Sequence, residues 1–316
     1  MKLVRPSREM LPFGLRAMKM IASVDGAISE TERGLIATAQ QAFGSDLDLD
    51  RLAPIEPEEL AEAITEPAAR RQIVRGMIVL SLMDGEASPA EAALVDRFAR
   101  ALLVEETDLK TLHQLAEHHF LRARFDIARR FFAREKVMEF TKEKGLLWLA
   151  KSLAAMAGLR QDDEIAGRYR ALEHAPAGSL GRGYFDFIRG NNFSFPGEKG
   201  SPPEVISLHD LTHVLSGYGT DPEGELQVLA FHTGCRKDDH DPFSFLLFGI
   251  AQFHLGLAIT PVVTGSHGKL DPALMWKALE RGAACTIDPT VGWDPWPVMR
   301  EPLQSLRERY GISELE

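Results

Sequence analysis

Apolar residues recur every three to four positions along the first third of the chain, which is the period of amphipathic helices. Two apolar runs, Met18–Val24 and Met77–Met83, are each followed by an Asp-Gly pair. Ser29 and Ser88 come next, and a glutamate three residues after each serine completes the capping box that begins a helix. Because the two serines lie 59 residues apart, the pattern predicts an internal repeat of a helix–turn–helix unit.

The rest of the chain also predicts helices, separated by loops. Helical spacing of apolar residues covers much of 119–157, whereas 175–183 and 190–203 are rich in glycine, proline and small residues and predict loops. The long loop 190–203 precedes a cluster of histidines and is a candidate lid. Helices are expected around the histidines and at 271–282 and 302–310, so the sequence predicts an all-α fold.

The segment 243–263 is strongly apolar and contains no Asp, Glu, Lys or Arg. Its 21 residues are enough to span a membrane, but Gln252 and His254 lie within it and Pro261 interrupts it. We therefore expect a buried helix that lines a lipid-accepting groove, or an interfacial element, with a membrane span as the alternative. As a buried polar residue, His254 then needs a hydrogen-bond partner.

Composition fits a globular protein with two domains. The chain has 316 residues, of which 45% are hydrophobic and 26% charged. We expect one helical domain at residues 1–115 and a second at 116–316. The net charge of −10 argues against nucleic acid as a partner. The chain has only two cysteines, Cys235 and Cys285, and no recognisable signal peptide, so we expect a cytoplasmic protein.

One segment departs from the acidic character of the chain. Residues 119–151 carry nine basic and four acidic side chains, which gives a local net charge of +5. Such a segment could face an anionic membrane, where each Lys or Arg near the surface contributes about 1 kcal/mol. The alternative is that it forms the solvated face of a helix.

The repeated Asp-Gly-x-x-Ser-x-x-Glu pattern resembles the TerB-like (tellurite resistance) family of helical domains, and the resemblance covers roughly Gly14–Leu103. The acidic residues of the two copies are Asp25, Glu32, Asp84 and Glu91. Together they could hold a hard cation such as calcium through oxygen ligands. The alternative is that each aspartate forms the turn and each glutamate caps a helix, which needs no cation.

Candidate chemistry is concentrated in the motif His209-Asp210-Leu-Thr-His213 and in Glu225, twelve residues beyond it. Two histidines four residues apart share one face of a helix, and Asp210 lies about 100° round the helix from His209. The Asp-Pro pair at 221–222 predicts a second helix whose first turn contains Glu225. If the two helices form a hairpin, these four side chains are a ligand set for a divalent metal. The alternative is that they are capped and solvated polar residues.

The ligand types narrow the choice of metal without fixing it. Mixed nitrogen and oxygen ligands suit zinc, our first candidate, while two histidines and one carboxylate also bind non-haem Fe(II), and magnesium is a further alternative. His232 lies two helical turns after Glu225 on the same face. It could be a further ligand, a proton carrier or a hydrogen-bonded structural residue.

The histidine motif resembles the signature of the coenzyme Q biosynthesis protein 4 (Coq-four) family, which is HDxxH followed by eleven residues and glutamate. The match has no gaps. Three further segments resemble the same family, namely Pro176–Tyr184, Trp276–Gly282 and Glu301–Ile312. The resemblance implies that residues 116–316 form a helical Coq-four-like domain that binds metal and lipid.

The Coq-four resemblance implies a protein of ubiquinone biosynthesis that acts on a polyprenylated benzoic-acid or quinone precursor, removing the C1 carboxyl group and hydroxylating the ring there. The protein would be a metal-dependent oxidative decarboxylase in which Asp210 and His213 are catalytic and His209, Asp210, His213 and Glu225 hold the metal. Peripheral attachment to the inner membrane and contact with other quinone biosynthesis proteins are also implied. Two alternatives stay open, a non-catalytic prenyl-lipid-binding scaffold for those enzymes and a TerB-type stress or metal sensor.

Overall fold

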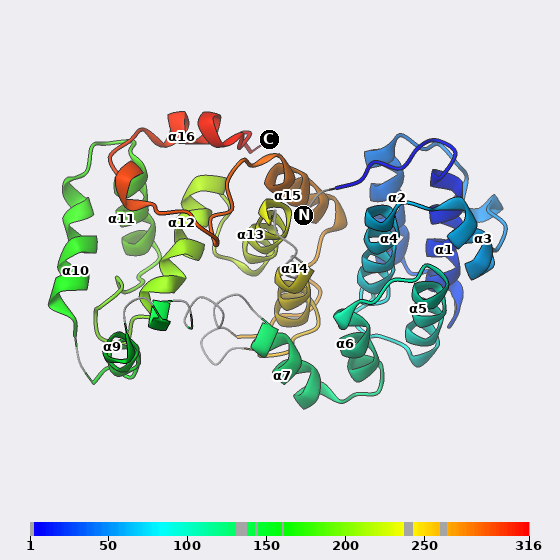
Figure 1. Cartoon of the computed structure of the whole chain (residues 1–316), viewed down its shortest axis with the longest axis horizontal. Coiled ribbons are helices and arrows are strands. Elements are labelled where there is room, and N and C mark those ends of the chain that lie inside the picture. The colour runs from blue at the N-terminus through cyan, green and yellow to red at the C-terminus, as the bar shows by residue number, and fades with distance from the viewer. Residues whose placement is uncertain are drawn as a thin grey trace. The chain divides into compact units, whose positions relative to one another are not determined.

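The computed structural model describes residues 3–130, 138, 140–142, 145–159, 161–236, 243–259 and 264–315. These residues form helices joined by turns and loops, and none of them lies in a β-strand (Figure 1). The predicted all-α fold is confirmed. The helices are α1 (Leu11–Ser23), α2 (Glu30–Phe43), α3 (Pro57–Ala63), α4 (Pro67–Leu80), α5 (Pro89–Ala101), α6 (Thr107–Ala116), α7 (Phe120–Arg130), α9 (Leu146–Met156), α10 (Asp163–Arg170), α11 (Leu180–Gly190), α12 (Ser207–Ser216), α13 (Pro222–Cys235), α14 (Phe243–Gly249), α15 (Pro272–Ala284) and α16 (Leu303–Tyr310).

The chain divides into two compact units, each made of two segments. The first unit comprises residues 1–129 and 241–277, and the second comprises 130–240 and 278–316. The domains expected from the sequence were continuous, whereas the apolar segment that begins at Phe243 belongs to the first unit. Local periodicity carries no information about which distant helices pack together, so the sequence pattern did not reveal this grouping. A domain boundary at residue 115 stays a prediction.

The first unit contains the predicted repeat, with α1 and α2 as one copy and α4 and α5 as the other. The hydroxyl oxygen of Ser29 accepts from the backbone N–H of Glu32 at 3.2 Å, and the Glu32 carboxylate accepts from the N–H of Ser29 at 2.7 Å. Ser88 and Glu91 form the same two hydrogen bonds at 3.1 and 3.0 Å. Both predicted capping boxes are therefore confirmed.

The two capping glutamates are buried and lie close to the aspartates of both turns. Burial is the main cause that raises the pKa of Glu32 and of Glu91, and the charges of Asp25 and Asp84 raise both further. The pKa of Glu91 reaches about 8. The two aspartates are near enough to both glutamates to shift their pKa, but the four carboxylates do not form a group at metal-ligand spacing among the described residues. The capping boxes account for both glutamates without a cation. Cation binding here stays a prediction.

The apolar segment of the first unit begins with α14 and continues as a π-helix, η4 (Ile250–His254). Every residue from Phe243 to His254 is buried. The Nε2–H of His254 donates to the carbonyl oxygen of Met83 at 3.1 Å, and its Nδ1 accepts from the N–H of Leu270 at 3.3 Å. The expected buried helix and the expected partners of His254 are therefore present, although residues 260–263 of the apolar segment lie outside the described residues. In the described part of the chain, no helix combines the length and hydropathy needed to cross a bilayer.

In the second unit, α11 begins earlier than expected. The side chain of Ser179 caps its first turn, so the helix starts at Leu180 inside the segment 175–183 that was expected to be a loop. The glycines of this segment favoured the loop prediction, but Gly181 instead lets α11 pack closely against the backbone at Met299. A Cβ atom on Gly181 would lie 2.8 Å from the carbonyl oxygen of Met299. The predicted loop after this helix is present, because residues 191–203 contain no helix.

Candidate metal site

The histidine motif and the glutamate beyond it lie on two consecutive helices, α12 and α13. Gly217 ends α12 in the left-handed conformation with a φ of +85°. The Asp221 carboxylate then accepts from the backbone N–H groups of Glu223 and Gly224, both at 3.1 Å, and begins α13. This cap places Glu225 in the first turn of α13, as the sequence predicts.

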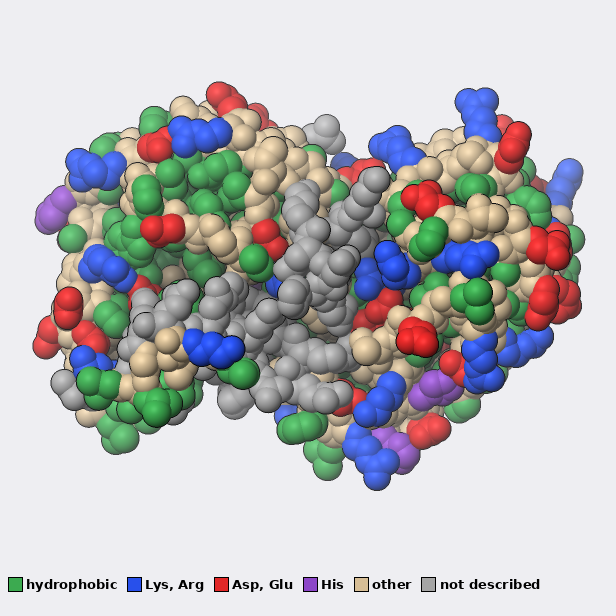
Figure 2. Space-filling view, in the orientation of Figure 1, with side chains coloured by type: hydrophobic (Ala, Val, Ile, Leu, Met, Phe, Trp, Pro, Cys, Tyr) green, Lys and Arg blue, Asp and Glu red, His purple; other side chains and the backbone are tan. Residues whose placement is uncertain are grey.

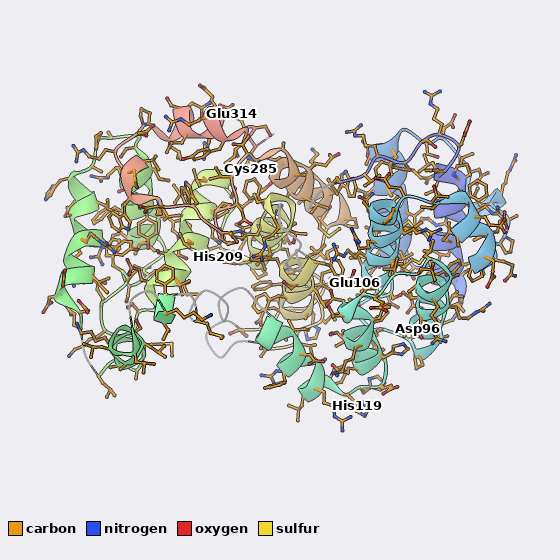
Figure 3. All side chains as sticks on the ribbon, viewed as in Figure 1. Asp96, Glu106, His119, His209, Cys285 and Glu314 are labelled. Carbon is orange, nitrogen blue, oxygen red and sulfur yellow. The ribbon has the colours of Figure 1, made fainter. Side chains whose placement is uncertain are left out.

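Three side chains of these helices meet in the second unit, where Figure 3 locates His209. The Nε2 atom of His209 lies 3.1 Å from Nε2 of His213 and 3.2 Å from Oε2 of Glu225. The Nε2 atom of His213 lies 3.4 Å from Oε1 of Glu225. Among the described residues, these three form the group of His, Cys, Asp and Glu side chains whose ligand atoms lie within 4.8 Å of one another.

The spacing of the three ligand atoms fits a single metal ion. Zinc bonds of about 2.0–2.2 Å in a tetrahedron place neighbouring ligand atoms about 3.3–3.6 Å apart. Bonds of about 2.1 Å in an octahedron place them about 3.0 Å apart. The observed separations of 3.1, 3.2 and 3.4 Å, two of which run to different oxygens of the Glu225 carboxylate, lie between these values. Three protein ligands leave a coordination position for water or substrate, as in catalytic zinc sites.

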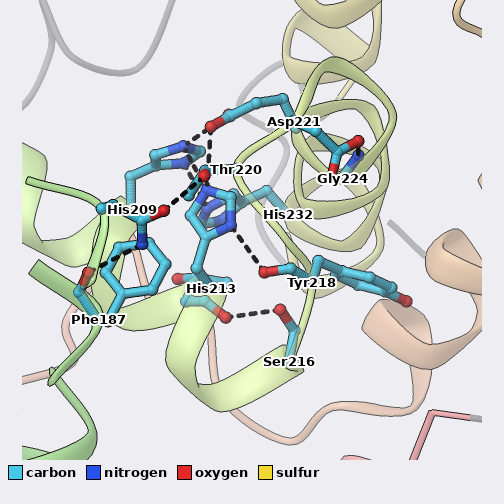
Figure 4. A network of polar contacts seen from close by, with 12 residues as sticks. Phe187, His209, His213, Ser216, Tyr218, Thr220, Asp221, Gly224 and His232 are labelled. Atoms are coloured by element: carbon cyan, nitrogen blue, oxygen red, sulfur yellow. Dashed lines mark hydrogen bonds and ion pairs between the residues drawn. The ribbon is translucent and has the colours of Figure 1, made fainter.

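A second contact of each histidine orients the nitrogen that faces the site (Figure 4). The Nδ1–H of His213 donates to the carbonyl oxygen of Tyr218 at 3.2 Å, so the neutral imidazole has the lone pair of its Nε2 directed at the group. The Nδ1 atom of His209 lies 3.4 Å from Nε2 of His232. Burial is the main cause that lowers the pKa of His232 well below its ordinary value, so His232 is neutral and accepts from His209. Hydrogen bonds of this kind orient histidines that bind metals.

The charges at the site suit a cation. Burial alone would raise the pKa of Glu225, but hydrogen bonds with His209 and His213 and the charges of these histidines lower it to about 2. Burial lowers the pKa of His213, yet its hydrogen bond with Glu225 and the charge of that carboxylate raise it overall. Glu225 is therefore ionised at neutral pH and supplies the negative charge that a divalent metal requires.

Asp210, the remaining predicted ligand, lies outside this group of three. Burial raises its pKa to about 6 and outweighs the opposing charges of the two histidines. Burial also raises the pKa of Tyr184, and the charge of Asp210 adds to the shift. The buried hydroxyl of Tyr184 has no hydrogen-bond partner among the described residues. Because Asp210 titrates near neutral pH, it is chemically able to exchange protons. Metal binding by Asp210 and catalysis by Asp210 and His213 stay predictions.

Aromatic side chains form one wall of the site. Phe187 of α11 stacks on His213, with ring centroids 5.4 Å apart and ring planes at 23°. Phe193 contacts Phe187 edge-on, with centroids 6.2 Å apart. The side chains of His209 and Glu225 are 17% and 21% exposed, whereas that of His213 is 1% exposed. The site is therefore reached from the side of His209 and Glu225.

Two contacts of the histidines were not assigned from the sequence. Of the three hypotheses for His232, its contact with His209 supports the hydrogen-bonded structural residue. The only sequence signal for the contact between His232 and His209 was that His232 lies on the same helix face as Glu225. The carbonyl of Tyr218 carries no such signal, because any residue at that position has the same backbone oxygen.

One comparison with known proteins bears on the first unit. The family described as tellurite resistance protein TerB matches residues 34–114, which are about a quarter of the chain. The match supports the TerB-like resemblance of the N-terminal region. It includes the second copy of the repeat, with Ser88 and Glu91, and begins within α2, after the Ser29–Glu32 capping box of the first copy. No curated protein matches the chain. The matched residues do not reach the metal-site helices, so the Coq-four resemblance stays a prediction.

Proposed function

We propose that the second unit binds a divalent metal, zinc in the first instance, through His209, His213 and Glu225. The observation that carries this proposal is the convergence of two histidine nitrogens and the Glu225 carboxylate at separations of 3.1–3.4 Å. Two outer hydrogen bonds that orient the histidines add support. A capped and solvated surface cluster would not require a buried His213 or a carboxyl group with a pKa of about 2.

We further propose that the metal site serves a reaction of ubiquinone biosynthesis, as the Coq-four resemblance implies. Segments that carry this resemblance contact α12. Arg307 donates to the carbonyl oxygens of Leu215 and Val214 at 2.9 and 3.1 Å. Arg281 donates to the carbonyl oxygen of Ser216 at 3.0 Å. The two arginines come from the two closing segments of the resemblance, so these segments stabilise the end of the helix that carries the histidines.

The chemistry of the site suits a prenylated benzoic acid. A bound divalent metal would hold the ring carboxylate and stabilise negative charge that develops on it. Phe187 and Phe193 would supply an apolar wall beside the ring of the substrate. Asp210 would be the group that exchanges a proton. Replacing the C1 carboxyl by a hydroxyl releases CO₂ and removes two electrons, so the reaction needs an external oxidant such as molecular oxygen.

A second candidate function is a stress or metal sensor of the TerB type. The match of residues 34–114 to the TerB family favours this sensor function, because the family is described as a tellurite resistance protein. In this alternative the acidic residues of the repeat bind a cation, and the histidine site is a separate metal site.

The first test is the metal content of freshly purified full-length protein by elemental mass spectrometry. We expect about one zinc, iron or magnesium per chain and its loss in the His209→Ala/His213→Ala variant. The exposed His174→Ala variant is the control and should keep the metal. If neither fresh nor resupplied wild-type protein retains a metal, the proposal is wrong.

The second test separates the enzyme from the scaffold. Metal-loaded protein is incubated with a prenylated hydroxybenzoate and oxygen, and released CO₂ and the hydroxylated product are measured. Product in the wild type and not in the His213→Ala variant supports the enzyme. Metal-dependent binding of the prenylated ligand with no product would instead assign the site to a lipid-binding scaffold.

A further inference from the structure

One helix of the first unit, α7, has exposed apolar side chains on one face. The inner face of α7 is fixed by buried Ala123, Asp126 and Ile127. The Asp126 carboxylate accepts from Gln114 Nε2 at 3.0 Å and pairs with Lys110 Nζ at 3.3 Å. The orientation of α7 on α6 is therefore set by both apolar and polar contacts, and its opposite face points to solvent.

Two large apolar side chains occupy the centre of this outer face. Leu121 and Phe125 lie one turn apart and are 78% and 70% exposed. Figure 2 shows apolar and basic side chains together where Figure 1 places α7. Arg122 lies about 100° from Leu121 on one side of the apolar stripe, and Arg124 lies about 60° from it on the other. The stripe thus has a positive charge on both edges.

Neither arginine is neutralised by an acidic side chain of the residues that the structure describes. No ion pair joins Arg122 or Arg124 to an acidic residue in the described part of the chain. The chain as a whole is acidic, with 46 acidic and 36 basic side chains. An apolar stripe edged by uncompensated arginines is the arrangement of helices that lie in the surface of a membrane, with the apolar residues between the lipids and the arginines at the headgroups.

We propose that the outer face of α7 binds the surface of a membrane that contains anionic lipids. Charge complementarity selects this occupant, since both edges of the stripe attract negative headgroups while the chain as a whole is acidic. Two apolar side chains on one helix are far less than the roughly 800 Å² per partner that a stable protein interface buries. They are enough for weak, reversible attachment to a bilayer. The proposal goes beyond the metal site and does not depend on it.

The test is sedimentation of the full-length protein with vesicles. Vesicles of phosphatidylcholine with phosphatidylglycerol are compared with vesicles of phosphatidylcholine alone. We expect binding to the anionic vesicles that decreases as salt is raised. Leu121→Gln/Phe125→Gln should weaken binding by at least about tenfold, since each side chain loses much of its apolar transfer energy. Arg122→Gln/Arg124→Gln should weaken it by about tenfold or more.

Controls separate this proposal from the others. Leu103→Gln replaces another leucine, 83% exposed and followed by Glu105 and Glu106, and should leave binding unchanged. The His209→Ala/His213→Ala variant should also bind vesicles as the wild type does, so failure of the metal site and of the membrane face can be told apart.

Three outcomes would overturn the membrane proposal. They are no binding to anionic vesicles, equal binding to both kinds of vesicle, and unchanged binding of the Leu121→Gln/Phe125→Gln variant. Light scattering of the vesicle-free protein adds a fourth outcome. A dimer that is lost in this variant would assign the face to a second copy of the chain.

Discussion

The Nε2 atom of His232 lies 3.4 Å from Nδ1 of His209, and this contact directs the other nitrogen of His209 toward Glu225. His232 is fully buried and belongs to the same helix as Glu225. One helix therefore supplies a ligand directly and also orients a ligand on the preceding helix. The contact makes the geometry of the site depend on a residue outside the histidine motif.

Replacing His232 tests this dependence. We expect His232→Leu to weaken zinc affinity by about 10–100-fold, the usual effect of removing a hydrogen bond behind a ligand histidine. The measurement is competition for zinc against a chelating dye. His232→Gln can still accept from the Nδ1–H of His209 and should recover part of the affinity. Equal affinities of the wild type and the leucine variant would show that His232 only fills space.

Glu225 should be essential for metal binding, whereas Glu223 in the same helical turn should not. Glu225→Gln keeps the size of the side chain but removes the charge opposite both histidines, so we expect loss of the bound metal at neutral pH. Glu223→Gln, on the exposed side of α13, is the matched control. Elemental analysis of the two variants after identical purification gives the comparison. Full metal retention by Glu225→Gln would remove this carboxylate from the ligand set.

Glu91 should make stability depend on pH. Its pKa is raised from 4.5 to about 8 in the folded protein, mainly by burial. The contribution of the protonated group to stability is therefore fully present below pH 4.5 and is lost as the pH rises through about 8. Glu91→Gln keeps a side chain that can complete the capping box and cannot ionise. We expect thermal unfolding to show the variant gaining stability relative to the wild type from pH 5 to pH 8.

The same variant addresses the cation hypothesis for the repeat. If calcium binds the gathered carboxylates, added calcium should raise the unfolding temperature of the wild type at pH 8 and have a smaller effect on Glu91→Gln. An equal response of both proteins to calcium would leave the capping boxes as the full explanation of these glutamates.

Arg307 should stabilise the helix that carries the histidines. Its guanidinium donates to two carbonyl oxygens at the C-terminal end of α12, where the backbone has no helical partners. We expect Arg307→Ala to cost about 1–3 kcal/mol of folding free energy, the range for a hydrogen-bonded charged group. Chemical denaturation measures this. Arg309→Ala, which removes an exposed ion pair with Glu301, should have little effect.

Local signals in the sequence predicted local structure well. Ser29 and Ser88 specified two helix starts through side-chain bonds that span only three residues. The spacing of the two histidines placed both on one face of a helix, and the cap at Asp221 placed Glu225 in the first turn of the next helix. These features need only the helix period and the position of one cap, and both can be read from the chain.

Structure that depends on distant contacts could not be predicted in the same way. His254 donates a hydrogen bond to the backbone carbonyl of Met83, which lies 171 residues away in the sequence. Nothing in the apolar run around His254 identifies that partner. Asp210 was expected among the ligands because it lies on the same helix as both histidines. Its side chain does not join the group of three, and metal binding by Asp210 stays a prediction.

The division of the first unit into residues 1–129 and 241–277 has a consequence for synthesis. A ribosome releases the N-terminal helices first, but the core of that unit lacks Phe243–His254 until the histidine motif has already been made. The nascent N-terminal helices must therefore wait, with part of their apolar surface uncovered, while the intervening 111 residues emerge. A chain stopped before residue 277 therefore yields neither unit whole.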